Sequence, residues 1–234
     1  MPVCLLVRHG HSTANERGIL AGWMPEVALT ERGRAQAALV AERIADLTVA
    51  RLVSSPLQRC RETAALIRTP DGPDVEVDDR LGECGYGEWT GRPLGELAED
   101  PLWRRVQDDP ATAAFADSTA YAGESLATMT ARVVGAVRAL DAEVAERAGP
   151  DALWIALSHG DPIKAVLASA AGGGVAQLQR WHVDPGSVSV VRFAGERSMV
   201  LASNVRDGGL VDLVRATAAP PDRVGEGAVG GGAS

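Results

Sequence analysis

Two short stretches of this chain are almost wholly apolar, and each ends abruptly in polar residues. They cover residues 3–7 and 153–157, and their lengths are typical of buried strands. Elsewhere, apolar residues recur at helical spacing. The helices that this pattern predicts begin after Thr30 and end near 47, cover 54–68 and 123–147, and span 162–170. The other strands that we expect are 51–54, 75–77 and a hairpin of 187–193 with 199–202 around Gly195.

Strands therefore alternate with helices along the whole chain. This order predicts an α/β fold built on a largely parallel sheet. Glycines and prolines indicate loops at 11–26 and 81–93, and residues 93–122 are expected to form an insertion of short helices that caps one face. The chain has no obvious linker, so we expect residues 1–215 to form a single domain. Residues 216–234 are rich in Ala, Gly and Pro, and we expect this tail to be disordered.

The composition supports such a core and narrows the choice of partners. Hydrophobic residues make up 46% of the 234 residues but aromatic residues only 4%, so Ala, Val and Leu must fill most of the core. The net charge of −8 argues against nucleic acid as a partner, because nucleic acids are bound through basic surfaces. An acidic protein that binds an anion must gather its positive charge locally.

Cysteine usage and hydropathy indicate where the protein works. Cys4, Cys60 and Cys84 are odd in number and lack zinc-type spacing, which favours a reducing compartment over a disulfide framework. No apolar run approaches the ~20 residues that span a membrane, and the N-terminus does not resemble a signal peptide. We therefore expect a cytoplasmic protein with no membrane partner.

The polar ends of the two apolar stretches resemble each other: Arg8-His9-Gly10 and Ser158-His159-Gly160. In open α/β sheets, ligand and catalytic groups gather at the carboxyl ends of strands. Arg59, at the head of a helix, and Glu83, in a glycine-rich loop, add a second guanidinium and a carboxyl group. These residue types suit phosphoryl transfer. Arginines stabilise the equatorial oxygens, a neutral imidazole can attack phosphorus, and a carboxylic acid can protonate the leaving alkoxide.

A longer series of motifs resembles the histidine phosphatase superfamily, also called phosphoglycerate mutase-like. The motifs follow the family order between residues 3 and about 203: Leu6-Val7-Arg8-His9-Gly10-His11-Ser12-Thr13-Ala14-Asn15, Ala21-Gly22-Trp23, Leu29-Thr30-Glu31-Arg32-Gly33-Arg34-Ala35-Gln36-Ala37, Ser54-Ser55-Pro56-Leu57-Gln58-Arg59-Cys60-Arg61-Glu62-Thr63-Ala64, Leu81-Gly82-Glu83, Gly87-Glu88-Trp89-Thr90-Gly91, Gly123-Glu124-Ser125 and Ser158-His159-Gly160. The resemblance implies a three-layer sandwich with helices on both faces of a mixed, mostly parallel sheet.

The resemblance also implies a role for each site residue. His9 would become phosphorylated, and Glu83 would donate a proton to the leaving group and then serve as the base for water. The residues implied to hold the phosphate are Arg8, Arg59, His159 and Asn15, with Gly22 and Trp23 beside the substrate. It implies no cofactor and no metal, and a small phosphorylated molecule as the ligand.

Some positions keep a second interpretation. Asn15 also suits a plain turn, and Trp23 is as consistent with packing as with a substrate wall. His182 is more often a structural histidine, and His9 with His11 could also be metal ligands, although Gly10 breaks the strand between them. Gly123-Glu124-Ser125 suits a helix cap and a substrate-contacting loop equally well.

The chain departs from the mutase pattern of the family. After the glutamate, cofactor-dependent mutases usually have Arg-His-Tyr-Gly, whereas this chain has Cys84-Gly85-Tyr86-Gly87, and an acidic segment at 93–100 replaces their long basic insertion. The pattern therefore favours a phosphomonoester hydrolase that works through phosphohistidine. A cofactor-dependent phosphoglycerate mutase and a non-catalytic module that binds phospho-ligands stay as alternatives. A homodimer paired through strand 187–193 is left open.

Overall fold

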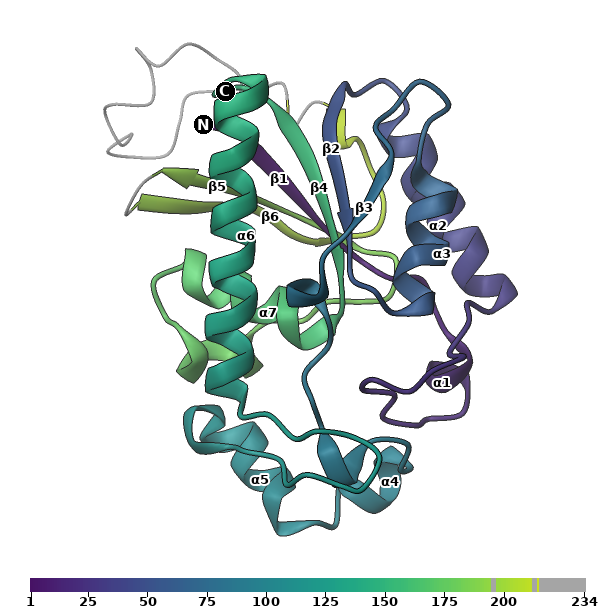
Figure 1. Ribbon diagram of the computed structural model, residues 1–234, viewed down its shortest axis with the longest axis vertical. Coiled ribbons are helices and arrows are strands. Elements are labelled where there is room, and N and C mark those ends of the chain that lie inside the picture. Colours follow the sequence, from purple (N-terminus) through teal and green to yellow (C-terminus); the bar gives the residue numbers. More distant parts are fainter. Residues whose placement is uncertain (195–196, 212–213, 215–234) are drawn as a thin grey trace.

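A computed structural model of the chain describes residues 1–194, 197–211 and 214. In this part of the chain, six strands form one sheet in the order β3-β2-β4-β1-β5-β6 (Figure 1). The strands are β1 (Val3–Arg8), β2 (Val49–Ser54), β3 (Val75–Val77), β4 (Leu153–Ser158), β5 (Val188–Ala194) and β6 (Arg197–Val205). Strands β3, β2, β4 and β1 pair in parallel, and β5 pairs antiparallel with both β1 and β6. The prediction of a mixed, mostly parallel sheet is confirmed.

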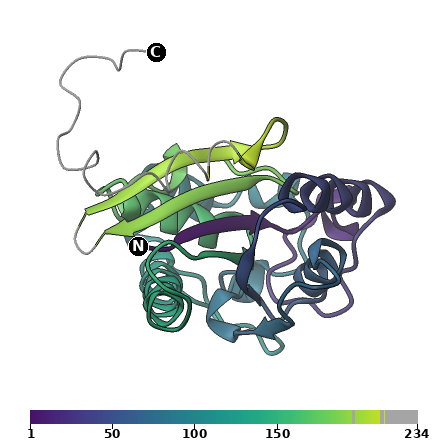
Figure 2. The same ribbon diagram turned by 90° about the horizontal axis from the view of Figure 1, so that it is seen from above.

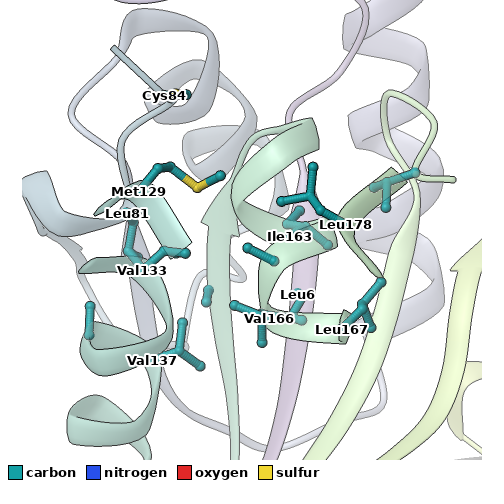
Figure 3. Packing of buried hydrophobic residues seen from close by; sticks show 14 of the residues in the cluster. Leu6, Leu81, Cys84, Met129, Val133, Val137, Ile163, Val166, Leu167 and Leu178 are labelled. Carbon is teal, nitrogen blue, oxygen red and sulfur yellow. The ribbon is translucent and has the colours of Figure 1, made fainter. Parts of the chain in front are cut away.

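Helices cover both faces of this sheet, because alternate residues of the central strands point in opposite directions. On β1, Cys4 and Leu6 pack with α6 (Leu126–Ala148) and α7 (Gly160–Ala170). Val3, Leu5 and Val7 pack with α2 (Glu31–Ile44) and α3 (Gln58–Ile67). Figure 2 shows α2 and α6 on opposite sides of the sheet, and Figure 3 shows side chains of α6 and α7 converging near Leu6. The three layers expected from the family resemblance are present.

The connections on the two sides of the sheet create a crevice between β1 and β4. These strands are neighbours in register, with Arg8 opposite Ser158. After β1 the chain continues to α2 on one face, whereas after β4 it continues to α7 on the other face. Such a reversal is where open α/β sheets bind their ligands. The fold therefore places Arg8-His9-Gly10 and Ser158-His159-Gly160 at one point.

Residues 93–122 contain the short helices that the sequence predicts around Trp103. These are α4 (Leu94–Leu97), α5 (Pro101–Asp108) and a single helical turn at Pro110–Thr112. In Figure 1, α4 and α5 lie together at one end of the molecule. Asp100 begins α5, because its side chain accepts a hydrogen bond from the Leu102 amide and Pro101 suits the first turn.

The structure corrects some predicted boundaries. The second predicted helix does not open at Ser54-Ser55-Pro56 but at Gln58, because Ser54 still belongs to β2 and the Ser55 hydroxyl contacts His159. The predicted loop at 11–26 contains α1 (Thr13–Glu16), and β6 extends to Val205. Further single turns lie at Asp79–Leu81, Gly87–Trp89 and Val175–Arg180. Gly195 and the tail at 216–234 lie outside the described residues, so the turn, the disordered tail and the single domain over 1–215 stay predictions.

Candidate active site

His9 and His159 face each other at the carboxyl ends of β1 and β4. Both side chains are buried, and their ring centroids lie 5.2 Å apart with an angle of 61° between the ring planes. This proximity follows from the sheet register, because each histidine comes directly after its strand. The sequence predicted that the two motifs would meet, and the structure brings them together.

The tautomer of His9 is set by its own turn. Its Nδ1 atom lies 2.7 Å from the Gly10 carbonyl oxygen, and a carbonyl only accepts hydrogen bonds. Nδ1 therefore carries the proton, and the Nε2 lone pair is free to attack. Burial, together with the charges of Arg59 and Arg8, holds the pKa of His9 well below its usual value of 6.5. The ring is thus neutral at neutral pH and has a free lone pair on Nε2.

Gly10 keeps this turn in place through a close backbone approach. A side chain at Gly10 would bring its Cβ to 2.4 Å from the Gly33 carbonyl oxygen at the start of α2. The Gly10 amide donates a hydrogen bond of 3.1 Å to the Thr63 hydroxyl on α3. Glycine is therefore required after His9, because any larger residue would push the strand end away from α2.

Arg8 and Arg59 bring two guanidinium groups to the same point, and both keep donors unused. Arg8 donates one hydrogen bond to the Val183 carbonyl, and Arg59 Nη2 donates to the Gly22 carbonyl at 2.8 Å. The buried Arg8 Nε and Arg59 Nη1 atoms have no hydrogen-bond partner. Neither arginine forms an ion pair with a residue that the structure describes. Because unpaired buried charge is costly, this arrangement suits an anion that completes it.

Glu83 supplies a carboxyl group whose properties suit proton transfer. Burial and the neighbouring Asp161 carboxylate raise the pKa of Glu83 to about 7, against the lowering influence of the Cys84 amide, Arg59 and Arg8. Its Oε1 atom accepts a hydrogen bond of 3.0 Å from the Cys84 amide. A carboxyl group with a pKa near neutrality can both give and take a proton, as an acid–base catalyst must.

Sequence reasoning missed the residues that hold His159. Its Nε2 atom lies 2.8 Å from the Ser55 hydroxyl and 3.5 Å from the Cys60 sulfur. Burial, Arg59 and His9 hold the pKa of His159 well below 6.5, so this ring is neutral as well. Burial also raises the pKa of the Cys60 thiol to about 12, so Cys60 packs here as a neutral thiol. Ser55 directly follows β2, as His159 directly follows β4. Their places at the same edge of the sheet could have identified Ser55 as a neighbour of His159 from the sequence.

The loop residues predicted to contact the ligand, Asn15, Gly22 and Trp23, also form hydrogen bonds that hold the protein's own structure. The Asn15 carbonyl oxygen accepts from the Ser12 amide at 3.0 Å and closes a capping box on α1, which leaves its NH2 group to donate to an anion. Gly22 adopts a φ of 48°, and its carbonyl oxygen accepts a hydrogen bond from Arg59. Trp23 is 36% exposed and donates through Nε1 to the Glu83 carbonyl at 2.7 Å. Trp23 therefore positions the loop that carries Glu83.

The two remaining histidines are hydrogen-bonded to residues outside the site, although His182 also lines a cavity that Arg8 and Glu83 line. His11 Nδ1 lies 2.9 Å from the hydroxyl of Thr30, the N-cap of α2, and its amide donates to Gln36 Oε1 at 2.8 Å. Within the described ranges, no three His, Cys, Asp or Glu side chains are grouped so that they could hold a metal ion. His182 is exposed, and its Nε2 lies 3.0 Å from Asp184 Oδ1.

Two polar networks next to Glu83 were not predicted. In one, Asp161 accepts from the Tyr86 hydroxyl at 2.8 Å and from the Lys164 ammonium at 3.1 Å. In the other, Arg132 pairs with Glu124 at 2.8 Å and donates to the Glu83 carbonyl at 3.2 Å. Ser125, next to Glu124, accepts from the Thr128 amide at the start of α6. The motif Gly123-Glu124-Ser125 thus caps a helix and holds the loop of Glu83.

Comparison with known proteins places this geometry in a family. The family model of the histidine phosphatase superfamily (branch 1) matches residues 4–206. The chain belongs to the histidine phosphatase superfamily. It is 30% identical over 203 residues to phosphoserine phosphatase 1 of Hydrogenobacter thermophilus, covering 86% of this chain and 91% of that protein. It is 28% identical over 171 residues to a 2,3-bisphosphoglycerate-dependent phosphoglycerate mutase of Thermoplasma acidophilum, covering 71% of this chain and 75% of that protein.

A solved phosphatase structure shares the fold. The crystal structure of phosphoserine phosphatase from Entamoeba histolytica in complex with 3-phosphoglyceric acid superposes with a TM-score of 0.74 at 23% identity, and the match covers 88% of this chain and 98% of that chain. None of the described helices combines the length and the apolar character that crossing a membrane requires.

Proposed function

We propose that this member of the histidine phosphatase superfamily hydrolyses phosphate monoesters of small metabolites through a phosphohistidine at His9. Nε2 of His9 attacks phosphorus, the bond from phosphorus to the ester oxygen breaks, and the departing alkoxide takes the proton of Glu83. Glu83, now a carboxylate, then removes a proton from water as the water attacks phosphorus. The N–P bond breaks, inorganic phosphate leaves, and both residues return to their starting states.

The phosphate would lie against the unused donors of the two arginines. Arg8 Nε and Arg59 Nη1 are buried without a hydrogen-bond partner, and this observation carries the proposal, because a dianionic phosphoryl group pairs both. Asn15 and His159 would add neutral donors. The same charges stabilise the equatorial oxygens in the transition state, where phosphoryl transfer most needs them.

Phosphoglycerate mutase is the second candidate, because several relatives bear that name. A mutase must retain a bisphosphate intermediate, which calls for further unpaired cations beside the site. Lys164 is already paired with Asp161, and Arg132 with Glu124. These pairings favour the hydrolase, in which the second phosphoryl acceptor is water.

The test is phosphate release from p-nitrophenyl phosphate and a panel of phosphometabolites, with a metal chelator present. We expect chelator-resistant release and an acid-labile, base-stable phosphoenzyme. The His9→Ala variant should keep its circular dichroism spectrum and lose at least about 10³-fold in kcat, because it lacks the nucleophile. Retained turnover in that variant would overturn the assignment. Interconversion of 2- and 3-phosphoglycerate with a bisphosphate primer would support the mutase, and tight ester binding without a phosphoenzyme would support a binding module.

The cysteines and the sheet edges bear on the compartment and on the oligomeric state of the enzyme. The three cysteines are free and buried, which supports a reducing compartment such as the cytoplasm. The expected pairing of two copies through strand 187–193 is wrong, because β5 is hydrogen-bonded to β1 on one side and to β6 on the other and has no free edge. A homodimer formed in another way stays a prediction. Size-exclusion chromatography with light scattering tests it, since the monomer mass is 24.4 kDa.

A further inference from the structure

A cavity of about 290 Å³ begins at Arg8 and Glu83 and extends away from the phosphate site. The whole chain has five Trp, two Tyr and two Phe residues, and four of these nine line this one cavity. They are Tyr86, Trp89, Trp103 and Phe115. In a chain so poor in aromatic residues, this concentration indicates what the cavity is built to hold.

The four rings form a fixed, flat-sided wall. Trp89 stacks on Trp103 with centroids 6.1 Å apart and an interplanar angle of 26°. Phe115 meets Tyr86 and Trp89 edge to face at 5.0 and 5.2 Å. Trp103 and Phe115 come from the insertion at 93–122, so the cap supplies half of the wall. Preformed aromatic walls bind flat apolar groups, because further rings can stack or pack edge-on against them.

Apart from Arg8, the basic side chains that line the cavity among the described residues are paired, Lys164 with Asp161 and His182 with Asp184. Of the described residues that line it, Arg8 and Lys164 are the fixed cations. Arg8 serves the phosphate, and Lys164 donates to Asp161 at 3.1 Å and to Gln179 at 3.3 Å. The other carboxylate oxygen of Asp161 accepts a hydrogen bond from the Tyr86 hydroxyl. A second anionic group on the substrate would therefore have no unpaired cation to meet and would lie near the Asp161 carboxylate, which is costly.

We infer that the preferred substrates are phosphate monoesters whose alcohol carries a small, flat, uncharged aromatic group, and that alcohols with a second anionic group are disfavoured. This inference rests on the proposed hydrolase function and concerns the leaving group of the same reaction. The volume lies near the lower end of the ~300–1,000 Å³ range of ligand pockets, which leaves room for a small ring system but not for a long chain.

The test compares three esters of primary alcohols with similar acidity: 3-phenylpropyl, propyl and 3-carboxypropyl phosphate. We expect kcat/KM to be at least about tenfold higher for the phenylpropyl than for the propyl ester, because the ring is buried. The carboxypropyl ester should fall below the propyl ester. A carboxypropyl ester that equals or exceeds the propyl ester, or a phenylpropyl ester with no advantage, would overturn the inference while leaving the hydrolase intact. No release from these esters or from p-nitrophenyl phosphate would overturn the hydrolase, and the inference with it.

Variants test each half of the inference separately. Trp103→Ala should lower the ratio of phenylpropyl to propyl kcat/KM by roughly tenfold. Trp181→Ala is the matched control, since Trp181 is half-buried but does not line this cavity, and it should leave the ratio unchanged. Gln107→Arg places an unpaired cation on an exposed position of the cavity rim, and it should raise carboxypropyl relative to propyl turnover. An unchanged phenylpropyl-to-propyl ratio in Trp103→Ala would contradict the preference for an aromatic group. An unchanged carboxypropyl-to-propyl ratio in Gln107→Arg would contradict the exclusion of a second anionic group.

Discussion

Replacing Glu83 with glutamine should stabilise the protein in alkaline solution while it impairs catalysis. Burial and Asp161 raise the pKa of Glu83 from 4.5 to about 7. The pKa of Glu83 is higher in the folded protein than in the unfolded chain, so the fold favours the protonated carboxyl group. The free energy of unfolding therefore falls as the pH rises from about 4.5 through 7. One pKa unit corresponds to about 1.4 kcal/mol, so ionised Glu83 costs at most about 3 kcal/mol. Half-burial makes this an upper bound, because water screens part of the cost.

The assay is urea unfolding at pH 5 and pH 8 in buffers free of phosphate and sulfate, since either anion would occupy the arginines and stabilise the fold. The stability gain of Glu83→Gln over wild type should grow from about 1 kcal/mol at pH 5 to at most about 3 kcal/mol at pH 8. Glu88→Gln, an exposed substitution in the same loop, should change stability equally at both pH values. A gain for Glu83→Gln that does not depend on pH would refute the raised pKa.

The same variant tests the catalytic role. Loss of the proton donor should cost about 10²–10⁴ in kcat with an alkyl phosphate, whose alkoxide leaves poorly without protonation. The loss should be much smaller with p-nitrophenyl phosphate, whose leaving group needs no proton. Wild-type kcat/KM should fall above about pH 7 as Glu83 ionises, and the variant should not show that fall. His9 stays neutral across this range, because its pKa is held well below 6.5. Equal losses with both esters would mean that Glu83 is not the acid.

Two further predictions concern the supports of the site. Gly33→Ala should destabilise the protein by roughly 1–3 kcal/mol in urea unfolding, because the new Cβ would lie 2.0 Å from the His11 carbonyl oxygen. Gly135→Ala, in α6 with open space around its Cβ, should instead stabilise by up to about 1 kcal/mol, and a loss there would contradict the reasoning. Arg132→Lys should lower kcat roughly 10- to 100-fold with an alkyl phosphate, and less with p-nitrophenyl phosphate, because the loop of Glu83 loses its hold. An equal effect on both esters would indicate a general loss of structure.

The sequence was sufficient for those parts of the site that depend on strand ends. Two apolar stretches followed by Arg8-His9-Gly10 and Ser158-His159-Gly160 required a common edge of a parallel sheet, and the register of β1 and β4 supplies it. The local requirement for positive charge in an acidic protein was also foreseen, and Arg8 and Arg59 meet it with unused donors. Periodicity did not reveal α1, which is only four residues long and is closed by a capping box of Ser12 and Asn15. It also misplaced the start of α3, because Ser54 stays in β2 and the Ser55 hydroxyl contacts His159.

The residues that tune Glu83 could not be predicted, because each has an ordinary local explanation. Asp161 lies in the first turn of α7, where a carboxylate suits the helix dipole. Lys164 follows at the i+3 position, where it is a common helix-surface partner. Only the tertiary fold brings Tyr86 to Asp161 and places that carboxylate near Glu83. Next to the effect of burial, Asp161 raises the pKa of Glu83, and the same carboxylate neutralises Lys164 in the cavity. One arrangement therefore supports both the proton donor and the preference for uncharged alcohols.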